Sequence, residues 1–193
     1  MSDTPKDPRA SLGQVATQTL SIGTELHRLY NTRFGPAAFN PCLGDPSRFA
    51  PISDNAGRCV PSLYAAETLV AAAYETVFRG VPLSFSNRRP SLSLGRIRHY
   101  GHALLGPSRD LTMVTLFNVP LRNHGVTRKQ LIESEAAHYR QTAKWAKAFH
   151  DQAPEAHGLI WTSRQDDCAK AYLFFGGPSL RGGFPGLENA PAG

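Results

Sequence analysis

Apolar and polar positions follow two different periods along this chain, and together they predict a mixture of strands and helices. Residues 26–30 (LHRLY) alternate apolar and polar side chains, as a short strand does, and place Arg28 on the opposite side from Leu29. Apolar runs bounded by turn residues predict further strands at residues 59–64, 97–105, 111–117, 158–162 and 170–175. Strands outnumber helices and do not alternate regularly with them, which favours an α+β fold over a doubly wound parallel sheet.

Residues 67–79 (ETLVAAAYETVFR) have the period of an amphipathic helix. Its apolar side chains form one broad side, which we expect to face the core; they are Leu69, Val70, Ala73, Tyr74, Val77 and Phe78. Glu67, Ala71 and Glu75 form a second row at a spacing of four residues. Small alanines around Glu75 leave room beside its carboxylate, whereas Glu67 is expected to be a solvated acid in the first helical turn.

A second helical stretch begins at a capping box formed by Thr127 and Gln130 and runs, with one break, to about residue 152. The preceding residues 118–125 are expected to be a connection. Residues 31–57 contain four prolines and three glycines, which predicts a long loop. A structureless loop of this length inside a small domain is uncommon and often functional.

The length of 193 residues fits one compact domain, or one domain with a short appendage. Residues 1–19 are polar and lack a clear period, which predicts a flexible or loosely docked arm. We therefore expect the domain to span residues 20–176. Residues 177–193 are rich in glycine and proline and are expected to form a tail that is mobile or draped over the surface.

Composition excludes several classes of protein. No run approaches the roughly 20 apolar residues that a membrane-spanning helix requires, and the N-terminus lacks the layout of a signal peptide, so we expect a cytoplasmic protein without a membrane segment. The three cysteines (Cys42, Cys59 and Cys168) form no CxxC pair. Neither a disulfide framework nor a structural zinc site is therefore expected, and the cysteines are interpreted as small buried or half-buried side chains.

The net charge of +6 has a definite location in the chain. No Asp or Glu occurs between Thr76 and Arg109, whereas this basic stretch contains Arg79, Arg88, Arg89, Arg96, Arg98 and Arg109. Such a stretch attracts an acidic partner, a phosphate-bearing ligand or nucleic acid through its electric field, or it is simply a solvated surface. Aromatic residues are sparse here and no zinc-finger or RNA-recognition motif accompanies them, which argues against nucleic acid.

The common catalytic motifs for nucleotides, serine hydrolases, zinc proteases and calcium are absent from the sequence. The seven histidines are scattered; His27 is a candidate general base beside Arg28, but a lone histidine is more often a structural or surface residue. Trp145 and Trp161 stand in apolar surroundings and are expected in the core.

Five short motifs in a fixed order carry a family resemblance. They are LHRLY with Arg28, SRFAP with Arg48, VPSLYAAET with Tyr64, AAAYETVFRGVP with Glu75, and HGLIWTSR with Ser163. Together they resemble the RES domain, which is named for its recurrent Arg, Glu and Ser, over residues 24–176. The usual Arg-Trp-Asn segment is here Arg48-Phe49-Ala50, which leaves Arg58 as a rival for the second arginine. We prefer Arg48 because the aromatic residue and proline that follow it keep the shape of the motif.

The resemblance implies a toxin of a bacterial toxin–antitoxin pair that degrades NAD or transfers its ADP-ribose. It implies an ADP-ribosyltransferase-like core with a split, mostly antiparallel sheet and flanking helices. Its substrate would be NAD, without a metal, and its partner an Xre-type antitoxin that carries the DNA-binding function; a homodimer is a further possibility. The alternatives are an ADP-ribosyltransferase that modifies a protein and, from another class, a basic nucleic-acid-binding module.

The residue types suit this chemistry independently of the family. Two arginines, Arg28 and Arg48, offer planar charged forks for a pyrophosphate. A carboxylate such as Glu75 stabilises the positive charge that develops on ribose when the nicotinamide bond breaks. Tyr64 offers a ring for nicotinamide and a hydroxyl for its amide, and Ser163 can donate to a ribose or nicotinamide oxygen.

Each of these residues also has a structural explanation. Glu75 and Arg79 are four residues apart, which allows a surface ion pair of a few tenths of a kcal/mol (~0.3). Tyr64 can be a core residue, and Ser163 a turn or cap residue. Arg28 can cover a strand edge, and Arg48 can hold its proline-rich loop in place.

Overall fold

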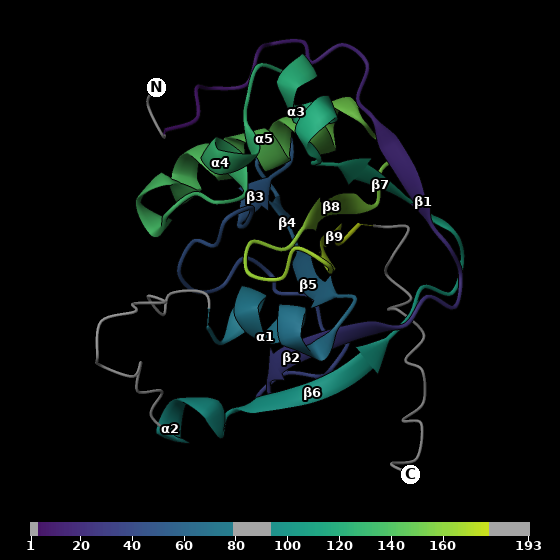
Figure 1. Cartoon of the computed structure of the whole chain (residues 1–193), viewed down its shortest axis with the longest axis vertical. Coiled ribbons are helices and arrows are strands. Elements are labelled where there is room, and N and C mark those ends of the chain that lie inside the picture. Colours follow the sequence, from purple (N-terminus) through teal and green to yellow (C-terminus); the bar gives the residue numbers. More distant parts are fainter. Residues whose placement is uncertain (1–3, 79–93, 178–193) are drawn as a thin grey trace.

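The computed structural model describes residues 4–78 and 94–177 of the chain. Its centre is a seven-stranded sheet whose neighbours pair antiparallel except for β7 and β8, which are parallel. The strands lie side by side in the order β1 (Thr17–Leu20), β7 (Leu111–Thr115), β8 (Gly158–Thr162), β9 (Lys170–Phe175), β5 (Ser62–Ala66), β2 (Leu26–Asn31) and β6 (Tyr100–Leu105). Figure 1 shows β2 and β6 at one end of this sheet and β1 and β7 at the other. The α+β prediction is thereby confirmed.

The sheet is nearly divided between β2 and β5. These two strands share a single registered pair, His27 with Ala66. Beyond this pair β2 continues along β6 over six residue pairs, whereas β5 continues along β9 over five. Because a strand whose neighbour diverges leaves one side open, this division provides the space in which side chains of both strands line a cavity.

Strict alternation along the central strands builds a core on each face of the sheet. Leu159 and Trp161 on β8 point to one core, and Ile160 between them points to the other. The same alternation on β9 sends Leu173 to the first core and Phe174 to the second. Trp145 and Trp161 are 2% and 0% exposed, so their prediction as core residues is confirmed.

Helices cover the first of these cores. The longest, α5 (Tyr139–Gln152), follows the short helices α4 (Arg128–Leu131) and η1 (Ala136–His138). The predicted capping box is present, because Thr127 Oγ1 accepts from Gln130 N and Gln130 Oε1 accepts from Thr127 N. The connection expected at residues 118–125 is wrong in part, because α3 (Asn118–Asn123) occupies most of it and buries Leu121.

The predicted helix near Glu75 exists as α1 (Leu69–Thr76), but its buried face is not the expected one. Leu69 and Val70 are 44% and 56% exposed, whereas Ala71, Ala72 and Glu75 are buried. The expected apolar face is therefore wrong for Leu69, Val70 and Phe78, which are exposed, whereas Val77 is buried as expected. The reason is a set of buried partners for Glu75 in distant segments, which the spacing of apolar residues cannot reveal.

Glu67 is also different from its expectation. Thr68 caps α1 by accepting from Ala71 N, so Glu67 precedes the helix. Its Oε1 accepts from Lys170 Nζ at 3.2 Å and from Tyr172 Oη at 3.0 Å, and its Oε2 accepts from Lys170 N at 2.9 Å. Glu67 is thus a link between the start of α1 and β9 instead of a solvated acid.

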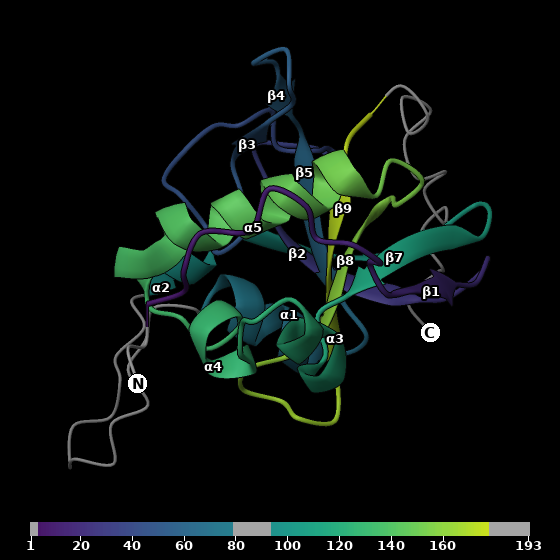
Figure 2. The same ribbon diagram turned by 90° about the horizontal axis from the view of Figure 1, so that it is seen from above.

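The N-terminal segment lies along α5 (Figure 2) and then enters the sheet as β1. Trp145 Nε1 donates to the Lys6 carbonyl at 2.8 Å, and Lys144 Nζ pairs with Asp7 at 2.9 Å. Leu12 is 8% exposed and belongs to the core. Residues before Leu20 therefore contact α5, the core and the sheet.

Two smaller differences concern strands. Pro61 interrupts the strand expected at residues 59–64, which becomes β4 (Cys59–Val60) and β5. β4 pairs with β3 (Ile52–Ser53), which lies inside the long loop. The strand expected from residue 97 begins at Tyr100, after the short helix α2 (Leu94–Ile97).

Within the described residues, no helix combines the length and the apolar character that crossing a membrane requires. The expectations for the tail at residues 178–193 and for Arg79, Arg88 and Arg89 fall outside the described residues.

Candidate functional site

A cavity of about 450 Å³ opens where β2 and β5 diverge. The long loop predicted between these strands forms much of its wall. Its other walls come from β2, β5, the end of α1 and the start of β6, which contribute Arg28, Tyr64, Glu75 and Tyr100. Among the residues that the structure describes, Arg28 is the one arginine in this lining, and the carboxylates are Asp45 and Glu75.

Groups that do not line the cavity, from two other segments, contact the carboxylate of Glu75. Arg48 Nη1 lies 2.9 Å from Glu75 Oε2, with side-chain exposures of 4% and 6%. Ser163 Oγ donates to Glu75 Oε1 at 3.1 Å, and the Arg164 N–H donates to the same oxygen at 3.4 Å. Of the five predicted residues, Arg28, Tyr64 and Glu75 line the cavity, whereas Arg48 and Ser163 contact Glu75 from outside the lining.

These contacts decide the charge of Glu75. Burial acts to raise its pKa, while the charge and hydrogen bond of Arg48 and the hydrogen bonds from Ser163 and the Arg164 N–H act to lower it. The pKa of Glu75 is lowered overall. The carboxylate is therefore ionised at neutral pH, and its two oxygens are fixed in direction.

Tyr64 lines the cavity, and its hydroxyl bonds the segment around Arg48. This hydroxyl accepts from Phe49 N at 3.2 Å and is hydrogen bonded to Ser47 Oγ at 2.9 Å. On the far side, Thr142 Oγ1 on α5 donates to the Arg48 carbonyl. Arg48 is consequently placed by its backbone as well as by Glu75.

Arg28 faces the cavity from β2. Its Nη1 donates to the Pro36 carbonyl and its Nη2 to the Ala38 carbonyl, both at 2.7 Å, so it also shapes the loop. Burial lowers the pKa of Arg28 to about 10, against a small opposing effect of Tyr30. No carboxylate of the described residues forms an ion pair with it. A partly desolvated cation with neutral partners favours an anionic ligand.

The rival arginine, Arg58, lies elsewhere. It follows the turn between β3 and β4, where its Nε pairs with Asp54 Oδ2 at 2.8 Å and its side chain is 79% exposed. It lines a second cavity together with His150 and Glu155. Of the two candidates, Arg48 is the one in contact with Glu75.

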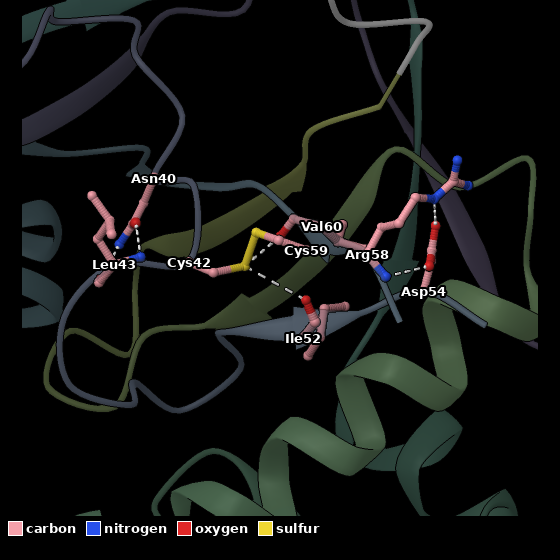
Figure 3. The surroundings of a disulfide bond; sticks show 8 residues. All are labelled: Asn40, Cys42, Leu43, Ile52, Asp54, Arg58, Cys59 and Val60. Atoms are coloured by element: carbon pink, nitrogen blue, oxygen red, sulfur yellow. Dashed lines mark hydrogen bonds and ion pairs between the residues drawn. A yellow bond between two sulfur atoms is a disulfide. The ribbon is translucent and has the colours of Figure 1, made fainter. Parts of the chain in front are cut away.

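A disulfide joins Cys42 to Cys59 and ties the loop that lines the cavity to β4 (Figure 3). The expectation that these cysteines are unpaired side chains is therefore wrong. Cys42 Sγ also lies 3.7 Å from the Ile52 carbonyl oxygen and 3.8 Å from that of Val60. The sequence does not predict this pairing, because two cysteines 17 residues apart follow no recognised spacing. Cys168 is free but exposed, so the expectation that it is buried or half-buried is wrong.

Other candidates from the sequence lie outside this site. His27 Nδ1 is 3.0 Å from His102 Nε2 on the neighbouring strand β6, away from the cavity lining. In the described part of the basic stretch, Arg98 precedes β6 and Arg109 follows it, so the strand separates them. In the described ranges, no three His, Cys, Asp or Glu side chains gather in a way that would bind a metal ion.

A comparison with protein families matches the RES domain to residues 25–182, which is most of the chain. No curated protein and no solved structure matches this chain.

Proposed function

The chain belongs to the RES domain family, and on this basis we propose that it is a toxin that consumes NAD by breaking the bond between nicotinamide and ribose. The observation that supports this reaction most directly is the ionised carboxylate of Glu75 in the wall of the cavity. Arg48 and Ser163 each donate to one of its oxygens, so its negative charge is oriented before any ligand binds.

In the proposed reaction the carbon–nitrogen bond breaks and its electron pair goes to the nicotinamide ring, which leaves as a neutral molecule. The ribose carbon becomes an oxocarbenium-like centre, whose positive charge Glu75 stabilises. A water oxygen then bonds to this carbon and releases a proton, giving ADP-ribose. With phosphate in place of water, the product is ADP-ribose phosphate.

Binding of NAD is assigned to the other lining residues. Arg28 is the cation that meets the pyrophosphate, because its guanidinium is the one arginine that the described cavity lining contains. Tyr64 offers its ring to nicotinamide. Arg48 and Ser163 do not contact the phosphates in this proposal. They contribute to NAD binding indirectly, because they position Glu75.

The biological setting follows from the same proposal. NAD depletion in the cytoplasm would harm the producing cell, so a partner must block the cavity. We propose an Xre-type antitoxin in this role, with contact to nucleic acid made by the antitoxin. An acidic or carboxylate-terminated segment of it would be steered to Arg28.

The test is release of nicotinamide from NAD by the purified chain. Glu75→Gln should abolish release; it should also lower the unfolding free energy, because the buried Arg48 loses its anionic partner, so release is compared after circular dichroism has shown that the variant is folded. Glu155→Gln, an exposed glutamate of the second cavity, should leave release unchanged. Product analysis with and without phosphate separates hydrolysis from phosphorolysis, and labelled protein would identify ADP-ribose transfer. Full turnover by Glu75→Gln would refute the role of Glu75. Salt-sensitive retention of nucleic acid without nicotinamide release would favour the basic binding module.

A further inference from the structure

We propose that Arg128 is a positioning residue, which holds the peptide between Ser163 and Arg164 so that its N–H points at Glu75. The effect on turnover rests on the proposed function, whereas the effect on Glu75 itself does not. Arg128 is the first residue of α4 and takes no part in the cavity lining.

The guanidinium of Arg128 forms hydrogen bonds to the end of β8 through two of its nitrogens. Nη1 donates to the Thr162 carbonyl at 3.1 Å, and Nη2 donates to the Ser163 carbonyl at 3.0 Å. Nε pairs with Glu133 Oε1 at 3.0 Å on its other side. Because all three nitrogens are engaged, the planar group has one orientation.

The peptide between Ser163 and Arg164 is planar and trans, so its orientation by Arg128 also orients the N–H that faces Glu75. Its carbonyl oxygen and its N–H point in opposite directions. The Ser163 carbonyl and the Arg164 N–H belong to the same peptide, so holding the former toward Arg128 turns the latter toward Glu75 Oε1, 3.4 Å away. The same backbone anchors Ser163 Oγ, the second donor to this oxygen.

The backbone at Arg128 is also held in place. The capping box of Thr127 and Gln130 closes the start of α4, and Leu131 in the same helix is fully buried. Glu133 and Asp167 lie near the guanidinium on the outer side, at 3.0 and 3.5 Å, and balance its charge there. Arg128 therefore acts on Glu75 through the orientation of a peptide, more than through its own charge.

Loss of Arg128 frees this peptide to rotate and removes donors from one oxygen of Glu75. We expect kcat for nicotinamide release to fall about tenfold in Arg128→Ala, the effect of one weakened hydrogen bond to a charged group. KM should change less than about twofold, because the loss is confined to the reacting carboxylate and the contacts of NAD with Arg28 and Tyr64 stay intact. The pKa of Glu75 should rise, because fewer donors stabilise its ionised form.

The experiment compares Arg128→Ala and Arg128→Lys with Arg122→Ala, an exposed arginine on α3, as control. The Glu75 carboxyl is titrated by carbon NMR, assigned through Glu75→Gln, and kcat and KM are measured alongside. The other charged groups near it, Arg48 behind and Arg28 and Asp45 across the cavity, stay unchanged. Lysine keeps the charge but has no bidentate fork, so an upward pKa shift in Arg128→Lys separates orientation from charge.

An unchanged Glu75 titration in both Arg128 variants would overturn the proposal, as would a loss seen in KM alone. If Arg128→Ala does not fold, the Arg128→Lys titration decides. If the wild-type chain releases no nicotinamide, the proposed function fails, while the titration still decides the role of Arg128.

Discussion

Replacing Arg48 by methionine is the sharpest test of the buried pair, because it leaves Glu75 as a charge without its cationic partner. Both side chains are almost completely buried, at 4% and 6% exposure, so solvent does not screen their 2.9 Å contact. Breaking such a pair costs about 3–5 kcal/mol. Two features favour the lower end: Glu75 keeps its donors Ser163 and the Arg164 N–H, and the buried Arg48 Nε, which has no partner among the described residues, is removed as well.

We therefore expect Arg48→Met to lose about 3 kcal/mol of unfolding free energy at pH 7. With a urea dependence of about 2 kcal/mol per molar, the midpoint falls by about 1.5 M. The fluorescence of the buried Trp145 and Trp161 reports unfolding. The double variant Arg48→Met/Glu75→Met should recover most of the loss, because two apolar side chains replace the pair without leaving a charge.

The pH dependence gives this prediction a signature. In the wild type the pKa of Glu75 lies below its ordinary 4.5, so the stability from this group is present above pH 4.5 and is lost as the pH falls further. In Arg48→Met burial is no longer opposed by the arginine, and the pKa rises above 4.5. The folded variant then gains a proton before the unfolded chain does, so its deficit shrinks as the pH falls from 7 to 5. Titration of the histidines is common to both proteins and cancels in the difference.

A deficit below about 1 kcal/mol at pH 7 would refute the reasoning, because a broken buried pair costs more than this. A deficit that grows on acidification would refute it as well. A double variant as unstable as the single one would show that the loss comes from packing and not from the unpaired charge.

Three further predictions concern other parts of the molecule. Ala71→Leu on the buried face of α1 should cost about 1–3 kcal/mol by overpacking, whereas Val70→Leu on its exposed face should change the unfolding free energy by less than about 0.5 kcal/mol; equal effects would contradict the observed helix orientation. Replacing both bridged cysteines by serine should lower the unfolding free energy by about 3 kcal/mol for a closed loop of this length, and a reductant should destabilise the wild type alone; a reductant-insensitive wild type would contradict this. Arg28→Ala should raise KM for NAD with little change in kcat, while Arg58→Ala should leave both constants unchanged, and the reverse ranking would exchange their roles.

Much of the fold was accessible from local signals. Residues 26–30, 111–117, 158–162 and 170–175 were each predicted as strands and are present as β2, β7, β8 and β9. The capping box at Thr127 was predicted at the residues where it occurs. These features depend on side chains within a few positions of one another, so the order of residues is sufficient to specify them. The same holds for the five motifs that point to the RES domain.

The candidate site required the tertiary structure because its contacts span long separations. Arg48 and Ser163 lie 27 and 88 residues from Glu75, and Arg128 reaches Ser163 from 35 residues away. Apolar spacing alone did not identify the buried face of α1, because it cannot show that Glu75 meets buried partners on distant segments while Leu69 and Val70 stay exposed. The sequence by itself therefore determined several of the strands, the start of α4 and the residue types of the site. Only folding decided that Arg48 supports Glu75, that Arg58 does not, and that Cys42 joins Cys59, since each depends on which distant segments meet.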